Sequence, residues 1–371
     1  MRVRLMFVVL WLMLTALPVA AQDDEPETML LNFIPNIQYA PFYVAQEMGL
    51  FAEQGLTITY DYLEEPLVLD LVASGEASLG MVSGEQVILA RAQQRPVTMV
   101  YEWYQQYPVG VVAPASSGIE SAADLAGVEV GLPGRFGANY IAFTALLSSA
   151  GLAEDEVNLQ EIGYNAPEVV CVGGVEASVV YINNEPLQIQ ERAERGDCGT
   201  VEAVTVIPVS SVSDLISNGI ITNETTIEQN PDLLRDVVAA FDEAVQMSIQ
   251  NPARAYLLSV DYIESLPASD ELVAALEALA AEQDAFLATE PTAEDIAQSR
   301  AELLETLQAD FDSAELLQFQ VLLETIPLWE AEQLGFSEVE AWENMQQTLL
   351  QIGLIEAATD LEAAFTNDFL P

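Results

Sequence analysis

The side chains best suited to ligand chemistry are aromatic rings in segments that follow predicted strands. These rings are Tyr39, Tyr43, Trp103, Tyr104, Tyr107, Phe136, Tyr140 and Tyr181. Only 8% of the chain is aromatic, so the grouping predicts a site that stacks on a flat ring. Each such contact adds about 0.5–1.5 kcal/mol beyond burial. The alternative is that several of these rings pack between helix and sheet.

One carboxylate stands out beside these rings. Glu185 lies in the segment 183–186 (Asn-Asn-Glu-Pro), at the end of a predicted strand. There it could accept charge-assisted hydrogen bonds from ring N–H groups, with Asn184 as a further contact. The alternative is an acid at a helix start that the helix dipole stabilises by about 0.3–1 kcal/mol. Tyr164 and Asn165 are candidate contacts at the rim.

Further polar groups follow two other predicted strands. Ser83 and Glu85 could cap the helix that follows them and also reach the ligand, although capping is the simpler role for Ser83. The loop 131–137 places backbone N–H groups at a helix start, which suits a polar or anionic group. Arg135 could add positive charge in this loop. Because the chain has no Lys and many acids, a strongly anionic ligand is disfavoured.

The composition excludes most catalytic machinery. The 371 residues include no His and no Lys. This removes Ser-His-Asp and Cys-His nucleophiles, His-ligated zinc, Lys Schiff bases and the P-loop lysine. Paired carboxylates or a carboxylate-bound metal would remain, but with 59 acidic residues chance pairs are expected. We therefore expect no enzyme, no metal and no cofactor.

The charge and hydropathy describe a folded, highly acidic chain. Its formal net charge is −49, which repels nucleic acid and anionic lipid at long range. Half of the residues are apolar (51%), so the chain can bury cores of ordinary size and is not a disordered acidic polymer. We expect no nucleic-acid partner.

The first residues predict export. Arg2 and Arg4 precede an apolar run over 5–17, and small residues end at Ala21. This pattern is typical of a signal peptide, here residues 1–21, and the run is short for a membrane span. No Cys lies near the expected cleavage site, so no lipid anchor is expected.

The chain has two cysteines, Cys171 and Cys198. In an exported protein an isolated pair favours a disulfide over a metal or redox site. The alternative is two buried thiols.

The elements that must position these side chains alternate through the first half of the chain. Strands are expected over 29–34, 56–60, 77–82, 97–101, 109–113, 128–132, 157–162, 175–182 and 203–209. Helices in the same part are expected over 39–48, 66–73, 84–92, 121–125, 138–150 and 185–195. Such alternation predicts right-handed βαβ units and mostly parallel sheets. From 214 onward we expect helices over 231–250, 269–287, 292–308, 313–324, 337–352 and 357–365.

The simplest architecture for this order has two α/β lobes. We expect lobe 1 to comprise residues 28–113 and 210–371, with a helical tail, and lobe 2 to comprise residues 114–209 inserted between them. Two crossing strands would then form the hinge. Ligands of open α/β sheets bind outside the carboxyl ends of the strands, so the candidate side chains should face the cleft between the lobes.

Several segments resemble a known family. The segment 39–51, followed by Gly55 and Leu56, is similar to the opening of type II periplasmic solute-binding proteins. The most similar branch binds the thiamine pyrimidine precursor, riboflavin or alkanesulfonates. Further similar segments are 75–80, 83–86, 90–92, 121–127, 131–134, 181–186 and 365–371. Each is weak alone, but their order and spacing from about residue 29 to the end are specific.

The resemblance implies the two-lobed type II periplasmic-binding-protein fold, in which each lobe is a mostly parallel sheet flanked by helices. It also implies a cleft that closes on the ligand and delivery to an ABC permease in the membrane. The segment 181–186 resembles the pyrimidine and riboflavin binders in particular. Synthases of this branch depend on a His and a Lys, and this chain has neither.

Our main hypothesis from the sequence is a monomeric solute-binding protein of the periplasm or cell surface, which captures a flat heteroaromatic vitamin or precursor. The thiamine pyrimidine precursor and riboflavin are equal candidates. Alternatives are an alkanesulfonate binder that uses the Arg135 loop, a sensory module that feeds no transporter, and an enzyme on the same fold. The predicted ligand contacts are Tyr39, Tyr43, Ser83, Glu85, Trp103, Tyr107, Phe136, Tyr140, Asn184 and Glu185.

Overall fold

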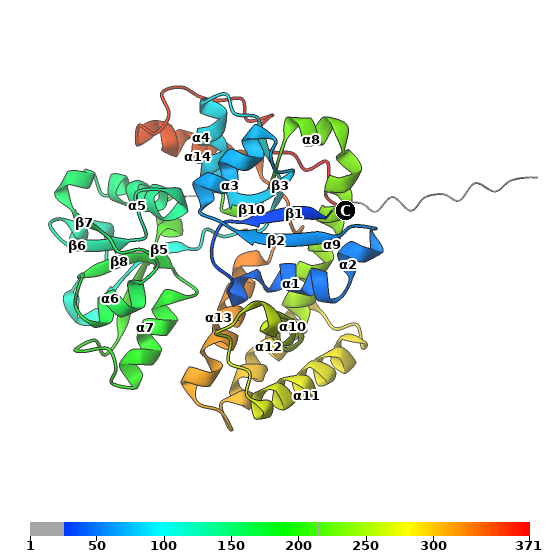
Figure 1. Cartoon of the computed structure of the whole chain (residues 1–371). Coiled ribbons are helices and arrows are strands. Elements are labelled where there is room, and N and C mark those ends of the chain that lie inside the picture. The colour runs from blue at the N-terminus through cyan, green and yellow to red at the C-terminus, as the bar shows by residue number, and fades with distance from the viewer. Residues whose placement is uncertain (1–25, 214) are drawn as a thin grey trace, which may run out of the picture.

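The computed structural model describes residues 26–213 and 215–371. The predicted signal peptide and its cleavage site lie outside the described residues. Two five-stranded mixed sheets, each flanked by helices, lie beside one another, and most of the C-terminal helices pack against the first (Figure 1). The two-lobed α/β fold expected from the sequence is confirmed.

The first sheet has the strand order β2-β1-β3-β10-β4. Its strands are β1 (Glu27–Leu31), β2 (Ile58–Tyr62), β3 (Leu79–Ser83), β4 (Val97–Glu102) and β10 (Asn218–Asn223). β1 pairs in parallel with β2 and β3, whereas β10 runs antiparallel between β3 and β4. The central strands β3 and β10 are buried along their whole length, in keeping with helices on both faces.

The second sheet repeats this pattern in the order β7-β6-β8-β5-β9. Its strands are β5 (Val109–Pro114), β6 (Glu129–Leu132), β7 (Asn158–Glu161), β8 (Ala177–Tyr181) and β9 (Val204–Pro208). Here β5 is the antiparallel strand, between β8 and β9. Each sheet therefore contains one strand that enters from the other lobe and runs against the rest.

The structure corrects the expected boundary of the first lobe. We expected residues 109–113 to end lobe 1, but β5 pairs only within the second sheet, so the first crossing lies between β4 and β5. An apolar run shows that a strand is buried but not which sheet it joins. β10 was not expected, because Gly219 and asparagines at both ends have low strand propensity. Pairing on both sides outweighs that propensity.

Helices cover both sheets. The first lobe carries α1 (Ala40–Glu47), α2 (Leu50–Glu53), α3 (Glu65–Ser74), α4 (Gly84–Ala92) and the 3-10 helix η1 (Ile37–Tyr39). The second lobe carries α5 (Gly137–Ser149), α6 (Ala166–Cys171) and α7 (Glu185–Glu194). Gly75 ends α3 in the left-handed conformation at φ +78, as expected from its position after the helix. The short helix α6 was not expected.

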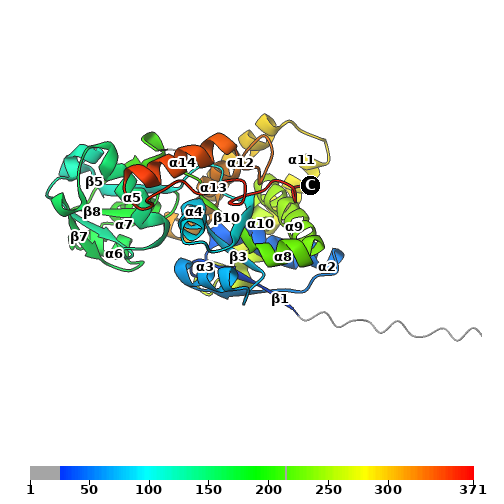
Figure 2. The same ribbon diagram turned by 90° about the horizontal axis from the view of Figure 1, so that it is seen from above.

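The C-terminal region is helical to residue 351. Its helices are α8 (Glu224–Gln229), α9 (Pro231–Gln250), α10 (Pro252–Ser259), α11 (Asp270–Leu287), α12 (Ala293–Leu307), α13 (Ser313–Trp329) and α14 (Val339–Gln351). α9 has the bounds expected from its amphipathic pattern. α13 continues past the expected end at 324, through Pro327. Figure 2 shows α14 alongside α4, against which it packs.

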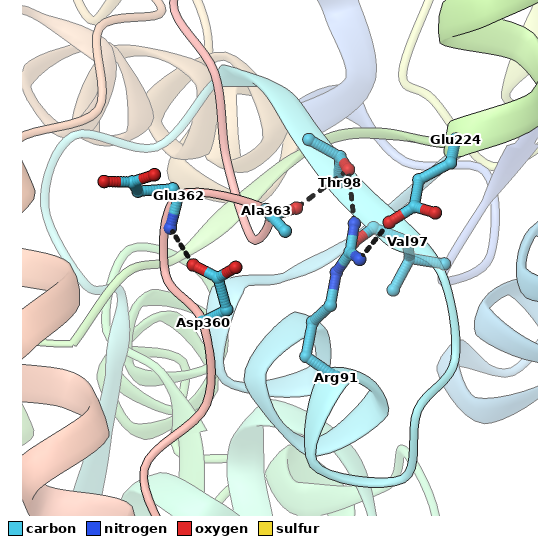
Figure 3. Close-up of polar contacts among 7 residues, drawn as sticks. All are labelled: Arg91, Val97, Thr98, Glu224, Asp360, Glu362 and Ala363. Carbon is cyan, nitrogen blue, oxygen red and sulfur yellow. Dashed lines mark hydrogen bonds and ion pairs between the residues drawn. The ribbon is translucent and has the colours of Figure 1, made fainter.

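Residues 357–365 do not form the helix that we predicted. The Met99 N–H donates to the Ala364 carbonyl, and the Thr366 N–H donates to the Met99 carbonyl, so this segment pairs with the edge strand β4. An extended segment beside an edge strand gives hydrogen-bond partners to the N–H and C=O groups of that strand, which a helix at the same place would not provide. Thr98 Oγ1 donates to the Ala363 carbonyl at 2.9 Å and accepts from Arg91 at 2.7 Å (Figure 3).

Cys171 and Cys198 form a disulfide in the second lobe. They belong to a small hydrophobic cluster between α6, α7 and the second sheet. In the part of the chain that the structure describes, no helix is both long and apolar enough to cross a bilayer.

Candidate functional site

A pocket lies between the two lobes. About 690 Å³ in and around it is free of atoms, and this figure includes space open to solvent. Both sheets direct loops at it from the carboxyl ends of strands, where open α/β sheets bind ligands.

Half of the predicted contacts line this pocket: Tyr39, Trp103, Phe136, Asn184 and Glu185. Each follows a strand, because η1 comes after β1, Trp103 directly follows β4, Phe136 precedes α5, and Glu185 opens α7 after β8. Lining a pocket is not contact with a ligand, so their role in binding stays a prediction.

Tyr43 points away from the pocket into the core of the first lobe. It is fully buried, its hydroxyl lies 3.0 Å from that of Tyr62, and its ring stacks on Tyr262 with centroids 4.4 Å apart. It lies one helical turn after Tyr39, on a face of α1 that packs against the C-terminal helices. We predicted Tyr43 as a ligand contact, but it does not line the pocket.

Tyr140 also lies outside the pocket. Its hydroxyl donates to Glu154 at 2.6 Å, and Arg135 bonds the same carboxylate at 3.1 Å. Arg135 pairs with Glu161 as well, at 2.7 Å, so this guanidinium faces the surface of the second lobe. Neither Tyr140 nor Arg135 lines the pocket. Only one side of the start of α5 faces the cleft, and these two side chains lie on the other side.

Ser83, Glu85 and Tyr107 lie behind the pocket wall. All three are buried, and Ser83 Oγ and Tyr107 OH both contact Glu85 Oε1, at 2.5 and 3.1 Å. Burial first, and then the charge of Glu65, raise the pKa of Glu85 to about 8. Glu65 itself lines the pocket and was not predicted. The three predicted residues thus support the wall and do not form it.

A chain of polar side chains runs along the pocket from one lobe to the other. The Tyr39 hydroxyl donates to Asn32 Oδ1 at 3.0 Å, and Asn32 Nδ2 lies 3.5 Å from Asn218 Oδ1. Asn218 Nδ2 donates to the Tyr181 hydroxyl, 3.1 Å away in the second lobe. Neither Asn32 nor Asn218 was predicted. The first strand was expected over 29–34, which put Asn32 inside it, and Asn218 opens β10, which was not expected.

Two further contacts join the lobes around the pocket. Phe33 and Tyr164 meet edge to face, with ring centroids 4.6 Å apart, and both line the pocket. Asn184 Nδ2 donates to Gln38 Oε1 at 3.2 Å. The structure therefore has its lobes in contact around the pocket. Tyr164 was expected at the rim, whereas Phe33 was not predicted.

Backbone N–H groups hold the Glu185 carboxyl group. Its Oε2 accepts the Tyr181 N–H at 3.0 Å. Burial raises the pKa of Glu185 to about 7, so the neutral acid is well populated near neutral pH. A neutral carboxyl can donate and accept at once. The indole N–H of Trp103, another lining residue, is buried and has no partner among the described residues.

Across residues 26–213 and 215–371, no group of three or more acidic, Cys or His side chains could hold a metal ion. The pocket therefore offers aromatic faces, amides and two carboxyl groups as its binding chemistry.

The sequence model of the family described as "NMT1/THI5 like" matches residues 36–255. The chain belongs to the NMT1/THI5-like family. The riboflavin-binding protein RibY of Chloroflexus aurantiacus is 30% identical over 95% of this chain and 88% of the relative. The formylaminopyrimidine-binding protein of Halalkalibacterium halodurans is 28% identical over 68% of this chain and 76% of the relative.

The same family contains enzymes. A 4-amino-5-hydroxymethyl-2-methylpyrimidine phosphate synthase of Legionella pneumophila is 26% identical to this NMT1/THI5-like chain, over 62% of it and 72% of the synthase. Among solved structures, the periplasmic aliphatic sulphonate binding protein SsuA of Escherichia coli matches with a TM-score of 0.59 at 14% identity, covering 91% of this chain and 92% of its own. At that identity the likeness shows the periplasmic-binding-protein fold alone.

Proposed function

We propose that this chain is the extracytoplasmic solute-binding component of an ABC importer, and that it captures riboflavin between its lobes. The observation that best supports this proposal is that both lobes contribute aromatic rings and hydrogen-bonding side chains to one pocket. The relationship to RibY supports riboflavin, since it extends over 95% of the chain. The protein would be exported and would deliver its ligand to a membrane permease.

The pocket chemistry suits the polar edge of a flavin. That edge presents a ring N–H between two carbonyl oxygens. A neutral Glu185 could accept the N–H with its carbonyl oxygen and donate its own proton to a neighbouring ring carbonyl. Tyr39 and Phe136, one from each lobe, could pack against the ring faces.

The thiamine pyrimidine precursor is the second candidate. The formylaminopyrimidine-binding relative favours it. An aminopyrimidine pairs an N–H₂ donor with a ring nitrogen acceptor, and the neutral acid of Glu185 is complementary to both. We rank it below riboflavin because this relative matches 68% of the chain, whereas RibY matches 95%.

Two other candidates have less support. Among the described residues no Arg lines the pocket, and Arg135 is bound by two glutamates, so a sulfonate would lack a cation. The synthases of the family are the enzymatic alternative, but this chain has no His and no Lys for their chemistry. A sensory module that feeds no permease would use the same pocket.

The first test is what the purified protein carries. The mature chain is denatured, and the released material is examined by absorbance and mass spectrometry. A yellow flavin supports the proposal, an aminopyrimidine selects the second candidate, and a sulfonate overturns the aromatic-pocket proposal.

An empty protein is titrated with riboflavin while flavin fluorescence is recorded. Thermal unfolding provides a second readout, since ligand at 100 times its dissociation constant stabilises by about 2.7 kcal/mol. No quenching and no thermal shift with riboflavin, together with a shift from formylaminopyrimidine, would reject the flavin. A matched titration with taurine tests the sulfonate binder.

A further inference from the structure

A pair of carboxyl groups shares one hydroxyl behind the pocket wall, where the two lobes meet. Ser83, the last residue of β3, has its Oγ 2.6 Å from Glu65 Oε1 and 2.5 Å from Glu85 Oε1. The Ser83 N–H also donates to Glu65 Oε1, at 2.7 Å. Ser83 and Glu85 have no exposed surface, and Glu65 is 6% exposed.

The two short contacts require two protons. A serine hydroxyl carries one proton, so it can donate to Glu65 or to Glu85 but not to both. With both carboxyls ionised, one of the contacts would place lone pairs against each other. A proton on Glu85 satisfies both, because Glu85 then donates to Ser83 and Ser83 donates to Glu65.

Glu85 is the better carrier of this proton. It is completely buried, and its Oε2 has no partner among the described residues. An ionised carboxylate with a bare oxygen is far more costly inside a protein than a neutral acid. Glu65, in contrast, accepts backbone N–H groups with both oxygens, which stabilises its negative form.

The charge on Glu65 faces the second lobe. Its Oε2 accepts the Ala138 N–H at 3.0 Å, in the first turn of α5, where the helix dipole favours an anion. Gly137 has φ +65, and a Cβ there would lie 2.5 Å from Glu65 Oε2. Glycine therefore permits the helix start to approach the carboxylate. Tyr107 lies beside the contact, with its hydroxyl 3.1 Å from Glu85 and 3.3 Å from the Ala138 carbonyl.

The groups that face Glu85 are acids or neutral hydroxyls. They are Glu65 of α3, Tyr107 of the first crossing, and Tyr181 of β8, whose own pKa is raised in part by Glu85. The chain has no Lys or His. Arg91 lies on the same helix, α4, but its guanidinium is bound to β4 and to a glutamate of α8. No cation among the described residues offsets a second charge here.

We propose that Glu65, Ser83 and Glu85 form a proton-dependent clasp that holds the second lobe closed over the pocket. The proton on Glu85 turns the Ser83 hydroxyl toward Glu65, and Glu65 then binds the start of α5. Loss of that proton puts two negative charges on one buried hydroxyl. Both carboxylates belong to the first lobe, so opening does not move them apart; it relieves the repulsion by letting water hydrate and screen the two charges. The closed lobe is thus favoured at neutral pH and released at alkaline pH.

The clasp bears on ligand binding because Glu65, Gly137 and Ala138 also line the pocket. Opening here would expose one wall of the site to water and weaken the ligand's hold. This step rests on the proposed function, whereas the clasp itself requires no ligand.

The test measures lobe closure without ligand. Cysteines are introduced at exposed Gln54 in the first lobe and exposed Asp155 in the second, and both are spin-labelled, since the native cysteines are in a disulfide. Distances between the labels are recorded from pH 6.5 to 9.5. We expect one short distance at pH 6.5 and a longer population that grows as the pH rises and Glu85 loses its proton.

Glu85→Gln is the decisive variant. Its amide donates to Ser83 at every pH, so the labels should report the closed distance throughout. Glu65→Gln loses the charge that binds α5 and should be open even at pH 6.5. Glu64→Gln removes an exposed charge one residue away, and it should titrate as the wild type does. Circular dichroism checks that each variant is folded.

The proposal is overturned if the wild-type distance does not change with pH, if Glu85→Gln opens together with the wild type, or if a folded Glu65→Gln stays closed. If Glu65→Gln does not fold, the comparison of Glu85→Gln with the wild type still tests whether closure depends on the proton. A protein that titrates as expected but binds no riboflavin would refute the proposed function and leave the clasp intact. Riboflavin binding without any pH-linked opening would refute the clasp and leave the proposed function intact.

Discussion

Asn183 Nδ2 donates a hydrogen bond to Thr325 Oγ1 at 2.7 Å, and both side chains are buried. Asn183 precedes α7 in the second lobe, whereas Thr325 lies on α13, which packs against the first lobe. The bond therefore joins the lobes on the side of the pocket where α13 and α7 meet. A helix remote in sequence thereby takes part in holding the cleft.

Replacing this hydroxyl should destabilise the closed protein. Thr325→Val keeps the shape but leaves one N–H of the buried Asn183 amide without its acceptor, which costs about 1–3 kcal/mol. We expect a lower free energy of unfolding in urea and weaker ligand binding. Thr325→Ser keeps the hydroxyl and serves as the control. Equal stability of the Val and Ser variants would show that the bond contributes nothing.

Ligand affinity should fall as the pH rises through about 7. Burial places the pKa of Glu185 there, and the proposed pairing uses its neutral form. Affinity is then full below pH 7 and drops about tenfold for each unit well above it. Calorimetric titrations at pH 6 and pH 8 measure this. Glu185→Gln should lose this part of the pH dependence and keep only the alkaline weakening that opening at Glu85 would cause. A pH response equal to that of the wild type would exclude Glu185 as the titrating group near pH 7.

The aromatic contact between Phe33 and Tyr164 should strengthen ligand binding without holding either lobe folded. Such pairs contribute about 0.5–1.5 kcal/mol, so Phe33→Ala should weaken binding by roughly 2- to 10-fold. Tyr164→Phe keeps the ring and should bind as the wild type does. A large loss of affinity in Tyr164→Phe would mean that its hydroxyl, not the ring contact, matters.

Stability should decline from acid to alkaline pH on account of Glu85. Its folded pKa of about 8 lies above the ordinary glutamate value of 4.5, so the folded state holds more protons than the unfolded state between these values. The free energy of unfolding must then fall with rising pH, by up to about 1.4 kcal/mol per unit from this group. Glu85→Gln should flatten that slope. Urea unfolding at pH 6, 7 and 8 would reveal the difference, and identical slopes would contradict it.

Removing the disulfide should cost stability but not binding. Cys171 and Cys198 are 27 residues apart, and closing such a loop is worth about 3–4 kcal/mol in the chain-entropy model. The double variant Cys171→Ala, Cys198→Ala should therefore melt at a lower temperature. Neither cysteine lines the pocket, so the dissociation constant measured on folded protein should stay the same. A matching loss of affinity would show that α6 supports the site.

The sequence predicts those parts of the fold in which local pattern and tertiary environment agree. The run that forms β3 is apolar because it is buried on both faces, and Gly75 ends α3 because it can adopt a positive φ. β10 and the segment 357–365 were misjudged for a common reason. Their conformation is set by pairing with β4, a partner more than a hundred residues away, and no local pattern carries that information.

Several site residues were predictable from their place in a segment that follows a strand, although Asn32 and Phe33 after β1 were missed. A residue that acts across the lobes was not predictable in this way. Trp103 and Glu185 belong to the first kind. Glu65 belongs to the second, since only the folded chain brings Ala138 to it. One signal was present: Glu65 precedes a proline at the start of a helix, as Glu185 does, and both carboxylates line the pocket.

The pairing of β5 with β9 has a consequence for how the two halves can be exchanged. These strands carry the chain into and out of the second lobe, and their residues pair from Gly110↔Pro208 to Pro114↔Val204. The two ends of that lobe thus lie one strand spacing apart, about 4.8 Å. A segment with adjoining ends can be excised and grafted as a cassette, leaving the first lobe to close over a new partner. Ligand preference can then change by replacement of half the cleft, while the half that carries the helical tail is kept.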